Sequence, residues 1–204
     1  MTTKRQSLPP LESEEAETSY ISLGLVVVVL LAIGAFLLVT TAPLERLLGG
    51  SAWAVIGVYH GLSAGLLLIV AAIGLYLAYR LFIGQIKAFH DLQLMSVVVS
   101  TLSFITIAFG NWIYIGYRSA GGARVYFLTH YPELHKVFFE FKEFVALFTF
   151  PLAVAATYIL LRYGEQLLQR RWLKATVAVL LAMVFFFFVV AFSLGAAITR
   201  IKPV

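Results

Sequence analysis

The chain has 204 residues, of which 61% are hydrophobic and only 12% are charged, and its mean hydropathy is +0.94. A soluble domain has about 45–50% apolar and about 25% charged residues, so this composition predicts an integral membrane protein with no soluble catalytic domain. The formal charge of +5 does not indicate a nucleic-acid partner, because Lys and Arg stand mostly at the ends of apolar runs, where membrane topology and lipid headgroups place them.

The chain contains no cysteine. This excludes disulfides, iron–sulfur clusters, covalently attached c-type haem and thiolate metal sites. Any metal ion must therefore be held by histidine, carboxylate or methionine.

The first 19 residues, MTTKRQSLPPLESEEAETS, are polar and carry four glutamates before the first apolar run. Such a composition is typical of a disordered tail or one ordered by a partner. It does not fit a secretory signal, because acidic residues separate the basic start from the apolar segment. We expect a polar acidic tail over residues 1–19.

The rest of the chain, residues 20–204, consists of apolar runs joined by short connections. A helix needs about 20 residues to cross the hydrocarbon core, and each run is at least that long. The fold class expected is an all-α integral membrane protein, a bundle of five transmembrane helices at about 20–41, 52–82, 91–117, 134–162 and 172–198.

The distribution of Lys and Arg predicts the orientation of the chain in the membrane. If side A is the side of the N-terminus, eight of the 15 Lys and Arg residues fall on side A and seven on side B. The positive-inside rule then favours a cytoplasmic N-terminus and an external C-terminus, in a bacterial or organellar inner membrane.

His60 is the most informative ionisable residue, because it lies furthest inside an apolar helix, within IGVYHGLSAG. Ionisable groups at such depth are costly and usually face the bundle interior or a site. Gly57, Gly61 and Gly65 repeat every four residues beside it and leave a stripe without side chains. The pattern fits either a haem approaching the backbone, with His60 as axial ligand, or a tightly packed neighbouring helix.

A second axial ligand is expected at the same level on another helix. His135 follows Pro132 at the side-B start of the helix at 134–162, and His130 lies two residues before that proline. His135 is the preferred partner of His60 for one b-type haem, and His130 is the alternative. His90 stands apart at the side-A start of the helix at 91–117.

A non-haem metal site made of His60, His135, Glu140 and Glu143 is a further alternative, since histidine and carboxylate bind Fe, Cu or Zn. On a helix, however, His135 lies about 140° from Glu140 and about 80° from Glu143. These directions do not bring the three side chains onto one ion.

Other polar side chains also gather at side B. Asn111 and Tyr114 end one helix, while Glu140 and Glu143 begin the next. They are expected either to exchange protons with a quinol, to contact a partner subunit, or to remain solvated at a helix start, where the helix dipole favours acidic groups.

These features favour an electron-transfer subunit of a respiratory or photosynthetic complex, which holds a haem b and exchanges electrons with a quinone or a redox partner. The alternative is a non-catalytic accessory or assembly subunit that binds other membrane subunits and lipids through the tail, the aromatic segment 118–133 and the last helix. A transporter is disfavoured, because little charge lies within the helices at 20–41, 52–82, 91–117 and 172–198.

Overall fold

The computed structural model describes residues 52–203, and this part of the chain consists of helices joined by short turns, with no strand. The tail predicted over 1–19 and the helix predicted at about 20–41 lie outside the described residues. The helices are α2 (Ala52–Phe82), α3 (Ala88–Arg118), α4 (Ala123–His130), the π-helical segment η1 (Leu134–Phe139), α5 (Glu140–Tyr163), α6 (Gln166–Gln169) and α7 (Arg171–Ile201).

Four segments of this part are long and apolar enough to cross a membrane. They are α2, α3 and α7, each of 31 residues, and the 30-residue stretch Leu134–Tyr163 formed by η1 and α5 together. A crossing needs about 20 residues. The described residues thus contain four candidate spans, as expected of an integral membrane protein, and the predicted fifth lies outside them.

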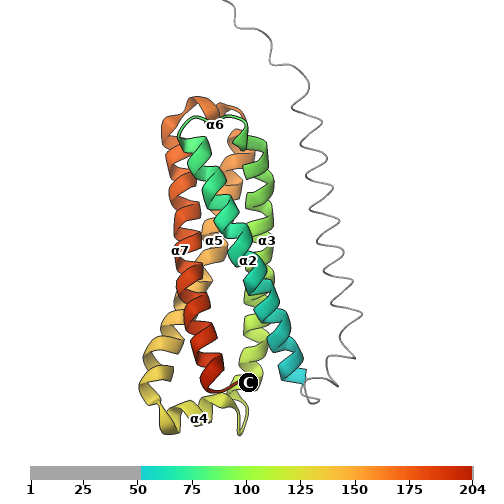
Figure 1. The fold of residues 1–204 in the computed structure, drawn as a ribbon, viewed down its shortest axis with the longest axis vertical. Helices are drawn as coiled ribbons and strands as arrows, with labels where there is room; N and C mark the ends of the chain where they lie inside the picture. The colour runs from blue at the N-terminus through green and yellow to red at the C-terminus, as the bar shows by residue number, and fades with distance from the viewer. Residues whose placement is uncertain (1–51, 204) are drawn as a thin grey trace, which may run out of the picture.

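The four long helices form an antiparallel bundle (Figure 1). α2 packs against α3 and α7, and α5 packs against the same two helices, so that α2 and α5 lie diagonally across the bundle. The start of α2, the ends of α3 and α7, and the short helix α4 meet at one end, which is side B of the predicted topology. The opposite end, side A, holds α6 and a tight α2–α3 turn in which Gly84 adopts a φ of 97°.

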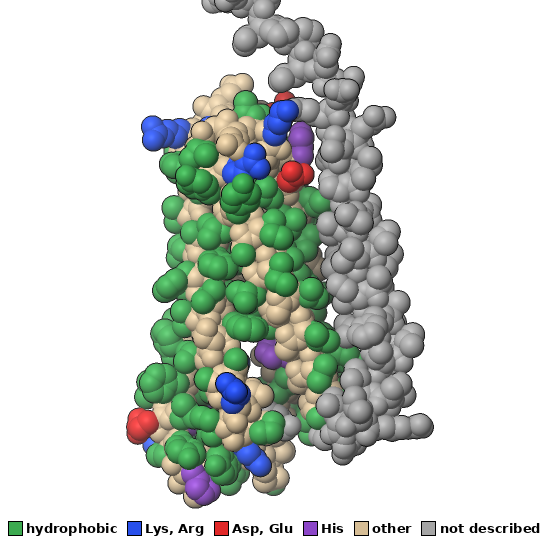
Figure 2. Space-filling view, viewed as in Figure 1, with side chains coloured by type: hydrophobic (Ala, Val, Ile, Leu, Met, Phe, Trp, Pro, Cys, Tyr) green, Lys and Arg blue, Asp and Glu red, His purple; other side chains and the backbone are tan. Residues whose placement is uncertain are grey.

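Three apolar clusters stabilise the bundle along its length. The side-A cluster includes Leu81, Leu92 and Leu160, and the central cluster includes Leu67, Leu102 and Val184. The side-B cluster is mainly aromatic, with Tyr117, Phe127 and Phe139 among its members. Outward-facing side chains are also largely hydrophobic, and charged side chains concentrate toward the two ends of the visible face (Figure 2). This distribution fits a bundle surrounded by lipid.

A close contact between α2 and α3 fixes their spacing at side B. A Cβ at Gly116 would lie 2.5 Å from Cδ2 and 2.8 Å from Cγ of Trp53. Real Cβ atoms do not approach a ring this closely, so the indole of Trp53 occupies the space that only glycine leaves on α3.

Gly116→Ala is therefore expected to force α2 and α3 apart and to lower the free energy of unfolding by about 1–3 kcal/mol, as overpacking does. The measurement is unfolding by SDS in mixed micelles, followed by circular dichroism. Gly61→Ala is the matched control, because no described atom lies within 4 Å of a Cβ at Gly61. Equal stability of the two variants would contradict the contact.

Candidate functional site

A layer of polar and small side chains separates the central cluster from the side-B cluster. On inward positions between the two clusters lie His60 and Ser63 of α2, Ser103, Thr106 and Gly110 of α3, Lys142 of α5 and Gly195 of α7. We call these seven residues the polar layer. Polar groups inside a membrane bundle are costly unless they are paired, and they commonly mark functional sites.

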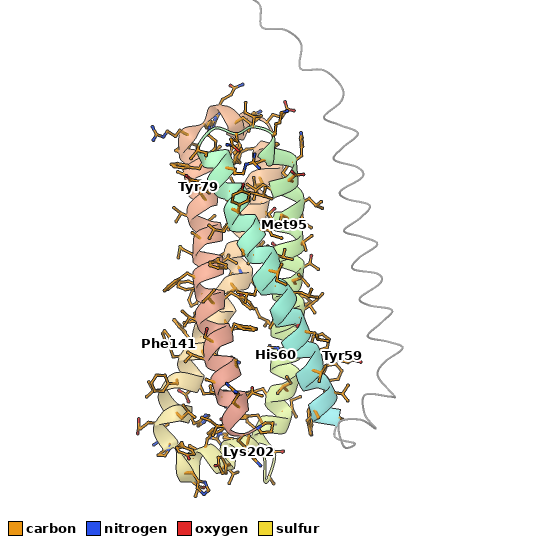
Figure 3. The ribbon with its side chains drawn as sticks, viewed as in Figure 1. Tyr59, His60, Tyr79, Met95, Phe141 and Lys202 are labelled. Atoms are coloured by element: carbon orange, nitrogen blue, oxygen red, sulfur yellow. The ribbon has the colours of Figure 1, made fainter. Side chains whose placement is uncertain are left out.

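His60 is held in one orientation within this layer. Its Nδ1 lies 3.0 Å from the carbonyl oxygen of Thr106, and because a carbonyl only accepts, Nδ1–H is the donor. In the neutral ring this leaves Nε2 unprotonated. Backbone bonds of this kind orient the imidazole of metal-binding histidines. Figure 3 shows His60 on α2, in the half of the bundle nearer side B.

The glycine that faces His60 comes from α3. A Cβ at Gly110 would lie only 3.1 Å from Cε1 of the His60 ring. By contrast, Gly57 and Gly61, proposed from the sequence to border a cofactor, have no described atom within 4 Å of a Cβ position, and the same holds for Gly65. Within residues 52–203, these three glycines therefore face open space.

Two hydroxyl groups of the layer lack a partner in the described part of the chain. Ser103 is 0% exposed and Thr106 is 6% exposed, and neither Ser103 Oγ nor Thr106 Oγ1 forms a hydrogen bond. The hydroxyl of Ser63 instead donates to the carbonyl of His60 at 3.0 Å. Buried polar atoms are almost always satisfied, so orphaned hydroxyls call for a bound molecule or water.

Lys142 points into the bundle, which the sequence interpretation missed. Its Cε and Nζ lie 3.4 Å and 3.9 Å from the position of a Cβ at Gly195 on α7, and Nζ lies 5.5 Å from the centre of the Phe139 ring. The spacing of residues could have indicated this position. The buried residues of α5 recur every three or four positions, and Lys142 continues the same stripe one turn closer to side B. The stripe consists of Val145, Thr149, Ala153, Ala156 and Leu160.

The predicted side-B polar residues separate into two groups. Glu143 is partly buried, and the Tyr114 hydroxyl lies within hydrogen-bonding reach of its carboxylate. The guanidinium of Arg118 lies 4.5 Å from the centre of the Tyr114 ring. Asn111 and Glu140 are exposed. Glu143 thus belongs to a network between α3 and α5 rather than to a solvated helix start.

His135 is 5% exposed and has protein partners on both ring nitrogens. Arg124 Nε donates to Nε2 over 3.4 Å, so Nε2 is an acceptor and Nδ1 carries the proton. That Nδ1–H donates to the Tyr117 hydroxyl oxygen over 2.9 Å. Tyr117 is in turn stacked on Phe139, with ring centres 4.4 Å apart. His135 therefore forms part of the side-B cluster, and it shares none of the described contacts of His60.

The remaining histidines lie at the surface. His130 ends α4, where its Nδ1–H donates to the Tyr126 carbonyl over 3.0 Å and its ring stacks on Tyr126. His90 is exposed at the side-A end of the bundle. Among the described residues, no three His, Asp or Glu side chains are grouped to hold a metal ion. The predicted His–Glu constellation is thus not assembled in this part of the chain.

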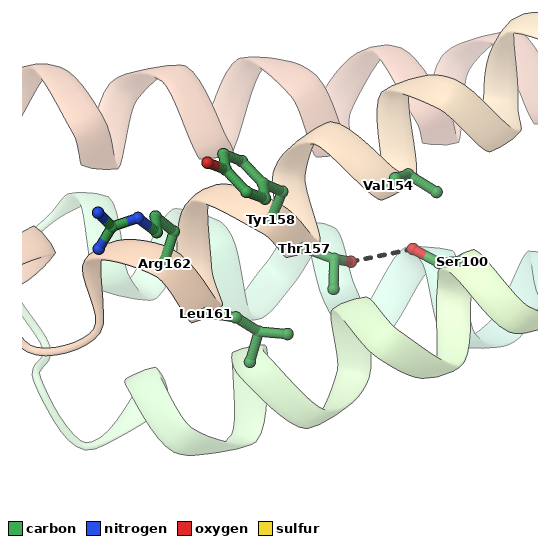
Figure 4. Close-up of a pocket in the computed structure, with 6 residues that line it drawn as sticks. All are labelled: Ser100, Val154, Thr157, Tyr158, Leu161 and Arg162. Atoms are coloured by element: carbon green, nitrogen blue, oxygen red, sulfur yellow. Dashed lines mark hydrogen bonds between the residues drawn. The ribbon is translucent and has the colours of Figure 1, made fainter.

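A separate surface groove of about 410 Å³ lies between α3 and α5, lined by Ser100, Val154, Thr157, Tyr158, Leu161 and Arg162 (Figure 4). The hydroxyls of Ser100 and Thr157 bond to each other over 2.9 Å, so they need no ligand. The groove contains no residue predicted to bind a cofactor.

Comparison of the chain with protein-family models, with curated proteins and with solved structures found no match.

Tyr117→Phe removes the only acceptor of His135 Nδ1–H among the described residues. It is expected to lower the free energy of unfolding by on the order of 1 kcal/mol. SDS unfolding measures the change. Tyr126→Phe is the control, because the Tyr126 hydroxyl has no hydrogen bond in the described part. A loss no larger than that of the control would show that the Tyr117–His135 bond contributes nothing to stability.

Proposed function

We propose that the protein is an electron-transfer subunit of a respiratory or photosynthetic membrane complex, with a b-type haem bound in the polar layer. The observation that supports this function is the orientation of His60. Its Nδ1–H is engaged by the Thr106 carbonyl, and its Nε2 is left without a hydrogen bond among the described residues. A neutral imidazole in this state presents a lone pair suited to haem iron.

The hydroxyls of Ser103 and Thr106, which lack partners in the described part of the chain, also support a bound group. Gly110 and Gly195 have no Cβ, which allows the His60 ring and the Lys142 side chain to lie against α3 and α7. When bound, the haem iron would accept one electron from a donor and pass it to an acceptor. A quinone or the redox centre of a partner subunit would exchange electrons with it.

His135 is the second candidate ligand, as the sequence predicted. To bind iron through Nε2 it would have to release Arg124, a contact that at 3.4 Å is long for a hydrogen bond. The bond from Nδ1–H to Tyr117 would then orient the ring, as the Thr106 carbonyl orients His60.

We also propose that side A is cytoplasmic and side B external. The sequence gives eight Lys and Arg on side A against seven on side B, and the inward position of Lys142 reduces the seven side-B charges to six. A lysine inside the bundle does not act as a loop charge, so the bias toward side A becomes larger.

The visible spectrum of the purified full-length protein tests the haem. The wild type is expected to show a reduced-minus-oxidised difference with a sharp α-band, and His60→Ala is expected to lose it. His90→Ala is the matched control, since His90 lies at the other end of the bundle and is exposed. His135→Ala identifies the second ligand, because its loss would convert a low-spin spectrum to a high-spin one.

A wild-type protein that remains colourless after expression with excess haem would refute the proposal. It would favour the accessory-subunit alternative, in which the aromatic segment 118–133 and the lipid-facing helices bind other subunits. In that case co-purification of membrane partners, without any chromophore, is the expected result.

A further inference from the structure

Lys142 places a cation inside the membrane bundle. Its Nζ lies near Gly195 and the Phe139 ring, and no hydrogen bond or ion pair to it is found among residues 52–203. An amine in a membrane interior is expensive unless an anion accompanies it, and such residues typically face a cavity or a ligand.

The nearest carboxylate along the chain does not fill this role. Glu143 is close enough to Lys142 for the two charges to affect each other, but no ion pair between them is found among residues 52–203, and the Tyr114 hydroxyl of α3 lies within hydrogen-bonding reach of the Glu143 carboxylate. Lys142 is instead on the stripe of α5 that faces the interior. The described part of the chain therefore supplies no anionic partner for the Lys142 amine on its interior side.

The position of Lys142 relative to His60 gives the chemistry of that group. The two side chains come from α2 and α5, on opposite corners of the bundle, and both face its interior between the central and the side-B clusters. Because helical side chains lean toward the helix N-terminus, and α5 begins at side B, the amine of Lys142 lies toward the side-B surface. A molecule bound to His60 in the interior would thus present its anionic end to Lys142 and to the nearer aqueous phase.

We propose that Lys142 binds a carboxylate of the ligand held by His60, namely a propionate of the haem. This inference rests on the function proposed above and adds a second anchoring residue to it. The orphaned hydroxyls of Ser103 and Thr106 are an independent sign that the polar layer is completed by a bound group. The charge of Lys142 selects for a ligand with a carboxylate, whereas His60 selects for iron.

The test compares haem b with its dimethyl ester, which has the same iron and ring but no carboxylate charge. Both are titrated into the full-length apoprotein in detergent and monitored by the Soret band. The wild type is expected to bind haem b about tenfold or more tightly than the diester, since truncating one partner of a buried charge pair is costly. Lys142→Met is expected to bind the two forms equally, and Lys142→Arg to retain the preference.

Each outcome has a distinct meaning. A wild type that binds both forms equally, or a Lys142→Met variant that keeps the preference, would overturn the role of Lys142 and leave the haem proposal intact. A wild type that binds neither form would overturn both proposals. Two controls separate a lost charge interaction from a misfolded bundle. A folded Lys142→Met variant should unfold in SDS like the wild type, and it should bind the diester with the affinity of the wild type.

Discussion

Polar side chains inside a membrane bundle must find their partners within the bundle, because hydrocarbon offers none. The four described spans meet this requirement differently along their length. Toward side A, Gln93 donates to the carbonyl of Leu160 and Ser100 bonds to Thr157, so that α3 and α5 are joined by satisfied hydrogen bonds. Toward side B, two hydroxyls and one amine are left without such partners. The unsatisfied groups set the polar layer apart from ordinary helix packing.

The surroundings of the layer are closely packed and hydrogen-bonded. Above it lies the central apolar cluster, and below it the stacked rings of Tyr117 and Phe139, with His135 held between Tyr117 and Arg124. The contact of Trp53 with Gly116 fixes α2 against α3 just below His60. A ligand site gains precision when its supporting shell is packed and hydrogen-bonded in this way. The two histidines that the sequence singled out thus have different environments: one faces unpaired groups, and the other belongs to a satisfied aromatic cluster.

Several features could be predicted from the sequence because they depend on local pattern. The apolar runs predicted the membrane class, and the described spans correspond closely to the expected segments at 52–82, 91–117, 134–162 and 172–198. The isolation of His60 within an apolar run pointed to the bundle interior. Other features depend on helix rotation. Gly57 and Gly61 were expected beside the ligand, yet Gly110 of α3 faces His60, because the inner face of α2 runs through His60, Ala64 and Leu67.

The sequence by itself determined that the chain is made of apolar helices long enough to span a membrane and that three of its four histidines fall toward side B, since hydrophobicity and length are local properties. The tertiary structure decided which of these groups share a site. It brought His60 of α2, Thr106 and Gly110 of α3, and Lys142 of α5 into one layer, and it assigned His135 to Tyr117 and Arg124. The reason is physical: a partner across the bundle is set by how the helices rotate and pack against one another, and residue spacing within a single helix does not contain that information.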